Sequence, residues 1–456
     1  MNIYIKVELK QRELESRLLL AMVAAERGHE VLLGSTLLTL ELVKKRFLKP
    51  GIIFEKSIVP SKRRINELKS YKDHNCKITS IDEEGGFINN SFKYLVEERF
   101  SPLSIRLTDK IFTWGNRDYR KLKSYFSKFK NKFSLTGNPR VDFWRKEFDN
   151  YYENQKLSQI KSSDEFLLLA SNFGSMMHER RIWQEVKVLR DRNIFERGRD
   201  ELLFYDYKSY QIKHAARFVK AIRKISQKFK NLKIVVRPHP TESADAWKSI
   251  IGEHKNIFVI QEGSIGKWIR KAKLVLHNSC TSGVESHSSN IPTIAYRPCK
   301  SNFEMKFPNS LSINIFNEKK LIEKIEQILK NKIQIRRNKK LNDYFLNIKD
   351  ELASDNIVKE WEKLDNGKLS KKNNLLKLKA LANLKELKGK LVNKLLSNKS
   401  KKFIQDPSRY KFAKITNNEL KTITDNLRKT LKRFENVNVE QFSDKLILIN
   451  KKKNKN

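Results

Sequence analysis

The chain has 456 residues, of which 39% are hydrophobic and 10% aromatic, so it is long enough for two domains with an appended segment and is not disordered throughout. Its formal net charge of +43 predicts attraction to phosphates, nucleic acid or anionic lipid without choosing among them. Three scattered cysteines, Cys76, Cys280 and Cys299, exclude a disulfide framework and a four-ligand zinc site.

Residues 1–150 have the pattern of a Rossmann-like domain. The sequence predicts a strand at 2–7, a helix at 12–27, where apolar residues recur at helical spacing, and a second strand at 30–34. This opening lacks a Gly-x-Gly-x-x-Gly phosphate loop, so we expect the domain to bind an acceptor and not the nucleotide. Further strands are expected near 52–54, 76–81, 110–113 and 132–135.

A second series of strands follows a polar segment at 146–163, which we interpret as a linker. From 164 to 340, apolar runs alternate with helical patterns, as is typical of a mostly parallel sheet with helices on both faces. The predicted strands lie at 165–170, 232–236, 257–260, 273–276 and 292–296. We therefore expect an α/β protein with two Rossmann-like domains facing across a cleft.

The C-terminal part of the chain has a different composition. Residues 341–365 are expected to hold a closing helix, and residues 366–456 carry 25 Lys and Arg against 7 Asp and Glu. Leucines between 375 and 396 recur at helical spacing among lysines, which predicts a basic amphipathic helix in a Lys-rich, helical and partly disordered extension. Such a helix either packs on the body by its leucines, or binds a partner or an anionic membrane surface.

The segment Arg237-Pro-His239-Pro240 follows the predicted strand at 232–236. Open α/β sheets bind ligands at the carboxyl ends of their strands, so this segment is a candidate phosphate site. Arg237 would be a bidentate phosphate ligand, and His239 a hydrogen-bond donor or general acid to a departing phosphate. The alternative is a structural histidine, although the flanking prolines restrain the backbone and favour the functional interpretation.

A small-residue turn follows the predicted strand at 273–276 and opens a helix. Its hydroxyls and free N–H groups suit a phosphate, although Ser282 with Glu285 also resembles an ordinary capping box. We assign to the donor site the residues Ser279, Thr281, Ser282, Gly283 and Glu285, together with Asn172 and Gly174 after the strand at 165–170.

Carboxylates and glycines stand together at Asp82-Glu83-Glu84-Gly85-Gly86, after a predicted strand of the first domain. Adjacent carboxylates repel each other and raise one pKa, which suits a general base, and we assign this role to Glu83 or Glu84. Three residues after later strands, Arg117, Asn138 and Arg140, are candidates for acceptor binding or for a structural role. No Asp-x-Asp motif is evident, so we expect no metal and no cofactor beyond the nucleotide sugar itself.

These motifs resemble those of bacterial GT-B glycosyltransferases of surface carbohydrate biosynthesis, which are related in motif to bacterial sialyltransferases and polysialyltransferases. The matching segments are Glu83-Glu84-Gly85, His239-Pro240 and Ser279 to Ser282, in that order, within residues 1–365. The resemblance implies a GT-B fold, a general base in the first motif, a CMP-phosphate contact or acid at His239, and phosphate-binding hydroxyls in the third. The third motif departs from the family, because Cys280 separates Ser279 from Thr281.

The resulting hypothesis is an inverting, metal-independent glycosyltransferase that uses a CMP-activated nonulosonate such as sialic acid or Kdo, with a glycan or lipid-linked acceptor. Two enzymatic alternatives remain, a CDP-glycerol-type glycerophosphotransferase and a UDP-sugar epimerase. The non-enzymatic alternative is a nucleic-acid-binding protein, which the pI of about 10.0 favours. Since the sequence contains no recognised nucleic-acid module, we expect no nucleic-acid partner.

The N-terminal residues lack the pattern of a signal peptide, and no run of about 18 apolar residues occurs in the sequence. We therefore expect a cytoplasmic protein that associates peripherally with the inner face of the plasma membrane through residues 366–456.

Overall fold

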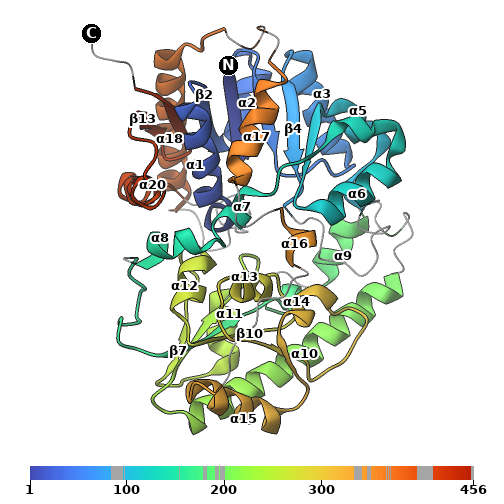
Figure 1. Ribbon diagram of the computed structural model, residues 1–456, viewed down its shortest axis with the longest axis vertical. Coiled ribbons are helices and arrows are strands. Elements are labelled where there is room, and N and C mark those ends of the chain that lie inside the picture. The colour runs from blue at the N-terminus through green and yellow to red at the C-terminus, as the bar shows by residue number, and fades with distance from the viewer. Residues whose placement is uncertain are drawn as a thin grey trace. The chain divides into compact units, whose positions relative to one another are not determined.

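The computed structural model describes residues 1–83, 96, 98–153, 155–177, 182–190, 195, 201–332, 341–346, 351–365, 367, 369, 371–397 and 414–452. The chain forms two compact α/β units (Figure 1). Unit 1 comprises Met1–Phe87, Ser91–Tyr151 and Lys340–Asn456, and unit 2 comprises Ile88–Asn90 and Tyr152–Lys339.

Unit 1 is built on an eight-stranded sheet of order β13-β14-β2-β1-β3-β4-β5-β6. Six neighbouring strands are parallel, and their apolar runs are buried as expected for a sheet covered on both faces. These strands are β1 (Asn2–Val7), β2 (Glu30–Ser35), β3 (Ile52–Glu55), β4 (Lys77–Ile81), β5 (Lys110–Thr113) and β6 (Phe133–Leu135). Each of them confirms a strand predicted from the sequence.

The helices of unit 1 begin where the sequence supplies caps. Ser35 and Ser61 accept hydrogen bonds from the first turns of α2 (Thr36–Lys44) and α3 (Lys62–Asp73). The central helix α1 (Lys10–Glu26) is buried along most of its length because apolar residues surround it on nearly every side. The others are α5 (Pro102–Leu107), α6 (Asn116–Tyr125), α7 (Pro139–Asp142), α8 (Asp149–Glu153, which ends in unit 2), α16 (Leu341–Tyr344), α17 (Ala353–Glu362), α18 (Leu375–Ser397) and α20 (Asn417–Leu431).

The predicted closing helix is present as α17, which packs beside α1 in unit 1 (Figure 1). Asp142 caps it, since its carboxylate accepts hydrogen bonds from the N–H groups of Ala353 and Ser354 at 2.8 and 3.1 Å. At the other end, the buried Trp361 donates to the Thr79 hydroxyl at 2.9 Å. Residues after 340 therefore return to the first unit and complete its core.

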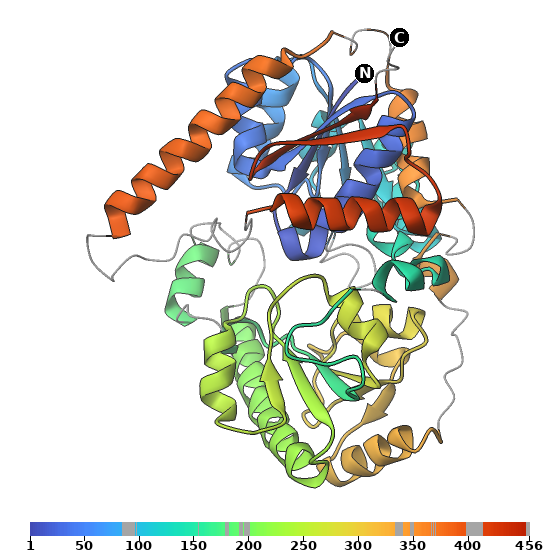
Figure 2. The same ribbon diagram turned by 90° about the vertical axis from the view of Figure 1, so that its left-hand side faces the viewer.

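The last part of the chain differs from the prediction of a helical extension, because it also contains a hairpin. The strands β13 (Val437–Ser443) and β14 (Leu446–Lys451) pair antiparallel, and β14 pairs antiparallel with β2. In Figure 2 this red hairpin extends the sheet that contains the blue N-terminal strands. The apolar run from Leu446 to Ile449 is at most 2% exposed, so the hairpin is part of the unit 1 core.

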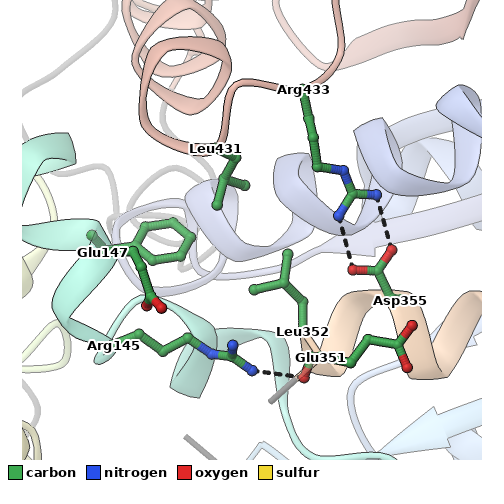
Figure 3. Close-up of a pocket in the computed structure, with 8 residues that line it drawn as sticks. Arg145, Glu147, Glu351, Leu352, Asp355, Leu431 and Arg433 are labelled. Atoms are coloured by element: carbon green, nitrogen blue, oxygen red, sulfur yellow. Dashed lines mark hydrogen bonds and ion pairs between the residues drawn. The ribbon is translucent and has the colours of Figure 1, made fainter. Parts of the chain in front are cut away.

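Arg433 ties the hairpin to the helices of unit 1. Its guanidinium donates two hydrogen bonds of 2.9 Å to Asp355 at the start of α17 (Figure 3) and two, of 2.6 and 3.1 Å, to Glu26 at the end of α1. Nearby, Arg145 donates to the Glu351 carbonyl at 2.7 Å. The pocket drawn in Figure 3 lies among these structural hydrogen bonds and ion pairs.

Unit 2 has a six-stranded parallel sheet of order β12-β11-β10-β7-β8-β9. The chain adds β8 and β9 on one side of β7, then crosses to add β10, β11 and β12 on the other, so the strand order reverses between β7 and β10. In open α/β sheets ligands bind at such a reversal, outside the carboxyl ends of the strands. The strands are β7 (Phe166–Ala170), β8 (Lys233–Arg237), β9 (Ile257–Val259), β10 (Leu274–His277), β11 (Thr293–Tyr296) and β12 (Ile313–Ile315).

Helices cover both faces of this sheet, and each face has its own apolar cluster. One cluster joins the sheet to the long α10 (Glu201–Lys228), and the other joins it to α12 (Ile265–Lys271). The remaining helices are α9 (Ile182–Arg190), α11 (Ala244–Ile251), α13 (Ser282–Ser288), α14 (Lys306–Ser310) and α15 (Glu318–Leu329). Both units are thus Rossmann-like, as predicted. Across the described ranges, no helix is both long and apolar enough to span a bilayer.

Candidate functional site

A buried carboxylate holds together the loops that follow β7 and β8. Glu242 accepts hydrogen bonds from the Ser171 hydroxyl and the Phe173 N–H, both at 2.5 Å, and from Trp247 Nε1 at 2.9 Å. The His239 N–H also approaches it, at 3.3 Å. These contacts position the predicted His-Pro segment at the carboxyl edge of the sheet.

Glu242 was missed by the sequence reasoning, although it stands three residues after His239 and only 4% of it is exposed. Burial raises the pKa of this carboxyl, and the hydrogen bonds from its four donors act in the opposite direction. The only signal in the sequence is an acidic residue in a loop that already carries a cation and an imidazole. Its role depends on partners from two other segments.

His239 is partly exposed and its ring orientation is fixed by the next turn. Its Nδ1 accepts a hydrogen bond from the Thr241 N–H at 3.3 Å and lies 2.8 Å from the Thr241 hydroxyl. Because Nδ1 is an acceptor, the neutral ring carries its proton on Nε2. The carbonyl of His239 is held as well, by Gln261 Nε2 at 3.1 Å.

Arg237, predicted as a phosphate ligand, binds backbone carbonyls of its own unit. Its guanidinium donates to the carbonyls of Ile260 and Gly263, both at 2.9 Å, and lies over the Trp268 ring. Burial lowers its pKa to about 10. In this arrangement Arg237 holds the loop between β9 and α12, while Pro238 is buried and Pro240 half-buried beside it.

The loop after β10 is organised by a buried histidine. His277 Nδ1 accepts from the Cys280 N–H at 3.1 Å, so the neutral ring donates from Nε2 to the Ser312 hydroxyl at 2.9 Å. Burial lowers the His277 pKa to about 3, which keeps the ring neutral. Burial also raises the pKa of the Cys280 thiol, so the cysteine that interrupts the third motif is a buried neutral group.

Gly283 allows α13 to pack directly on this histidine. A Cβ at this position would lie 2.6 Å from His277 Nε2, so no larger residue fits without a shift. The expected capping box is absent: Thr281 is the N-cap residue and makes no side-chain cap hydrogen bond. Ser282 is the first residue of the helix and is buried, as is Glu285, whose carboxylate lies beside Gly266 of α12.

Ser279 joins the third motif to a pocket of about 640 Å³ beside β11 and β12. It has a left-handed backbone (φ 58°), and its hydroxyl accepts from Asn309 Nδ2 at 2.9 Å. This volume lies in the range of small-molecule sites. The pocket was not foreseen from the sequence, and its lining includes Arg297, Lys300, Asn302, Glu304, Asn309 and Asn314.

Asn278 spans the point where the strand order reverses. Its Nδ2 donates to the Asn172 carbonyl at 2.8 Å, which links the loops after β10 and β7. Its Oδ1 is buried and has no hydrogen-bond partner within the described part of the chain. Such an acceptor is costly to bury unsatisfied, and a ligand with a donor group would satisfy it. Gly174, two residues after Asn172, has a φ of 56° and packs against Gln211 of α10.

In unit 1 the structure brings two predicted residues together. Glu83 is 3% exposed and lies 2.7 Å from Arg17 Nη2 and 3.6 Å from Arg140 Nη1. Arg17, which sequence reasoning missed, stacks at 4.3 Å over the Phe54 ring. Glu83 therefore anchors two arginines at the carboxyl end of the sheet, whereas Glu84 lies outside the described residues.

The remaining candidates of unit 1 have local structural partners. Asn138 is fully buried and caps α7, accepting from the Arg140 N–H at 2.8 Å. Arg117 lies over the Tyr344 ring at 4.6 Å, within the same unit. Within the described part of the chain, no cluster of three His, Cys, Asp or Glu side chains is arranged to hold a metal ion.

A buried carboxyl in the first turn of α6 makes the stability of the protein depend on pH. Asp118 is 4% exposed, and burial raises its pKa to about 7. Between pH 4 and 7 the folded chain therefore keeps a proton that the unfolded chain releases, so this group lowers stability as pH rises. We expect Asp118→Asn to be more stable than the wild type at pH 8, by at most about 4 kcal/mol, and little changed at pH 4.

Urea unfolding of the two proteins at pH 4, 6 and 8 measures this difference. Asp425→Asn, on the exposed side of α20, is the control and should follow the wild type at every pH. Equal stability of the Asp118→Asn variant and the wild type at pH 8 would show that the carboxyl is ionised without cost.

No protein-family model matches the chain, and no curated protein matches it. Several solved structures are similar in fold. The co-structure of S. aureus MnaA with UDP matches with 14% identity and a TM-score of 0.50, over 80% of this chain and 97% of MnaA.

Two others have lower scores. A UDP-GlcNAc 2-epimerase from Methanocaldococcus jannaschii in complex with UDP-GlcNAc and UDP has 14% identity and a TM-score of 0.49, over 80% of this chain and 100% of its own. The wall teichoic acid polymerase TagF has 10% identity and a TM-score of 0.44, over 68% and 71%. With two Rossmann-like sheets, one parallel and one with six parallel strands and an antiparallel hairpin, and with its likeness to MnaA, the chain has the GT-B-like fold that its motifs predicted.

Proposed function

We propose that this protein is a nucleotide-sugar-dependent glycosyltransferase of surface polysaccharide biosynthesis, inverting and metal-independent, with a CMP-activated nonulosonate as donor. The observation that carries the proposal is the convergence of three loops at the carboxyl ends of β8, β7 and β10, held by Glu242 and Asn278. They meet at the strand reversal of unit 2, the place where open α/β sheets bind nucleotides.

In this proposal the nucleotide occupies the loops after β7 and β10. Asn278 Oδ1 is an acceptor awaiting a donor, which a ribose hydroxyl or a base amino group supplies. The pocket beside Ser279 and Asn309 offers further polar groups and Lys300, whose charge suits an anionic nucleotide. Thr281 contributes its hydroxyl at the start of α13.

His239 acts on the leaving group. Its Nδ1 is held as an acceptor by Thr241, so Nε2–H is the nitrogen that donates to a phosphate oxygen as the bond to the sugar breaks. Arg237 stabilises this segment through its hydrogen bonds to the carbonyls of Ile260 and Gly263. The acceptor hydroxyl needs a base, and because Glu83 is engaged by Arg17 and Arg140, we assign that role to Glu84.

Nucleotide binding to the intact protein tests the site. CMP should raise the melting temperature more than CDP, UDP or GDP, because a ligand of the folded state stabilises it by mass action. Asn278→Ala should weaken CMP binding about tenfold, the loss of roughly one hydrogen bond. The control is Ser226→Ala, which removes a hydroxyl on α10 paired with Asn256 at 2.5 Å and should bind CMP normally. Equal shifts with all four nucleotides would refute the CMP assignment.

A UDP-sugar epimerase is the second candidate, favoured by the likeness to MnaA in its UDP-bound structure. The two functions differ in whether product requires an acceptor. With a CMP-sugar, transfer should appear only when an acceptor glycan is added and should fall at least 100-fold in His239→Ala. Conversion of a UDP-sugar without acceptor would establish the epimerase and overturn our proposal.

A further inference from the structure

The helix α18 packs on unit 1 by only one of its faces. Leu378 and Ala382 are 1% and 2% exposed and join the apolar cluster of the unit 1 sheet. Two ion pairs add to this contact, since Lys379, at the flank of the helix, binds Glu440 of β13 at 2.6 Å and Lys385 binds Glu41 of α2. The helix is therefore held in place by its inner face.

The outer face of α18 is also apolar. Leu376, Leu384, Leu387 and Leu391 are 83%, 62%, 56% and 63% exposed. At about 100° per residue, these leucines and the exposed Ala380 fall within an arc of about 80°. Figure 2, where α18 is the long orange helix at the left, shows its second half standing clear of the sheet of unit 1. Soluble proteins rarely expose such a stripe unless it binds something.

Lysines border this stripe on both sides. Lys377 and Lys388 lie at one edge of the arc that the leucines occupy around the helix axis. Lys379 lies beyond the other edge. The stem of Lys377 is held over the Phe47 ring, with its ammonium 5.1 Å from the ring centre. The helix thus has an apolar stripe with a cationic border, and it is too polar to cross a bilayer. This is the pattern of a helix that lies in the membrane interface.

We propose that the outer face of α18 docks this protein on the surface of an anionic lipid bilayer, with the leucines among the acyl chains and the lysines at the headgroups. Charge decides between possible occupants. A second copy would be another chain with a net charge of +43 and would be repelled, and nucleic acid would leave the leucines in water. This inference does not depend on the proposed catalytic function.

Vesicle cosedimentation of the full-length protein tests it. We expect binding to phosphatidylcholine vesicles with 30% phosphatidylglycerol, at least tenfold weaker binding to phosphatidylcholine alone, and weakening by 0.5 M NaCl. Leu384→Gln/Leu387→Gln should bind at least tenfold more weakly. The matched control is Leu202→Gln/Leu203→Gln, which changes two exposed leucines of α10 and should bind like the wild type.

A second measurement detects insertion of the helix directly, so the test does not rest only on variants that lose binding. In Leu387→Trp, the emission of the new indole should shift to shorter wavelength only with anionic vesicles, relative to the wild-type spectrum. Equal binding by the Leu384→Gln/Leu387→Gln variant overturns the proposal. So does a dimer or a duplex-DNA complex that these same substitutions abolish.

Discussion

Removal of residues 414–456 is expected to abolish stable folding of unit 1. The deletion takes away α20, β13 and β14, and with them the strand that pairs with β2 from Val31 to Gly34. It exposes the edge of β2 and the apolar side chains beneath the hairpin, and it leaves Glu26 and Asp355 without Arg433. We expect a loss of more than about 5 kcal/mol, comparable to the whole stability of many domains.

The unpaired edge also predicts how the shortened protein fails. Exposed strand edges pair with other chains, so we expect aggregates and little soluble protein. Removing only residues 453–456, which end the chain with two further lysines at Lys453 and Lys455, is the control and should leave the urea midpoint unchanged. A soluble monomer without residues 414–456 that unfolds at the wild-type urea concentration would contradict the expectation.

The parallel strands were predictable because each is a short apolar run bounded by polar residues. Leu167–Leu169 and Val235–Val236, for example, are fully buried, so nothing outside the run was needed to recognise them. The hairpin was not predictable in this way. Only three of the seven residues of β13 are buried, and β14 pairs Leu448 with Leu32, more than 400 positions earlier. A local pattern carries no information about so distant a partner.

The candidate site follows the same division. The His-Pro segment and the Ser-Cys-Thr-Ser turn were recognisable from residue types after apolar runs, and the structure places both at strand ends of unit 2. The side-chain partners were not recognisable. Arg237 donates to the carbonyls of Ile260 and Gly263, which lie 23 and 26 positions later in the chain. Likewise, the pairing of Glu83 with Arg17 depends on how α1 packs on the sheet.

Glu242→Ala is expected to destabilise unit 2 by about 3–5 kcal/mol. The substitution removes the acceptor for Ser171, Phe173 and Trp247 and leaves these buried donors without it. Glu242→Gln should lose less, because an amide oxygen still accepts while its NH₂ group faces donors. Urea unfolding of both variants measures the effect, with Glu253→Ala, an exposed carboxylate after α11, as the control that should match the wild type.

The same residue predicts a pH effect of definite sign. Since burial raises the pKa of Glu242 in the folded state, the folded chain binds a proton at pH values where the unfolded chain has released it. Its contribution to stability therefore falls as pH rises from the unfolded pKa toward the folded one, and the Gln variant lacks this dependence. Identical pH profiles of wild type and Glu242→Gln would show that the four donors hold the carboxylate ionised throughout.

Nucleotide binding shows whether Glu242 positions the binding loops or only contributes to the stability of unit 2. If the carboxylate positions the loops after β7 and β8, Glu242→Gln should bind CMP more weakly than wild type at a temperature where both are fully folded. The reason is that the His239 N–H and the Ser171 hydroxyl share the same acceptor oxygen, so replacing it changes both contacts. If the Glu242→Gln variant is destabilised but binds CMP with unchanged affinity, Glu242 stabilises the core only. Binding would then depend on Asn278 and His239.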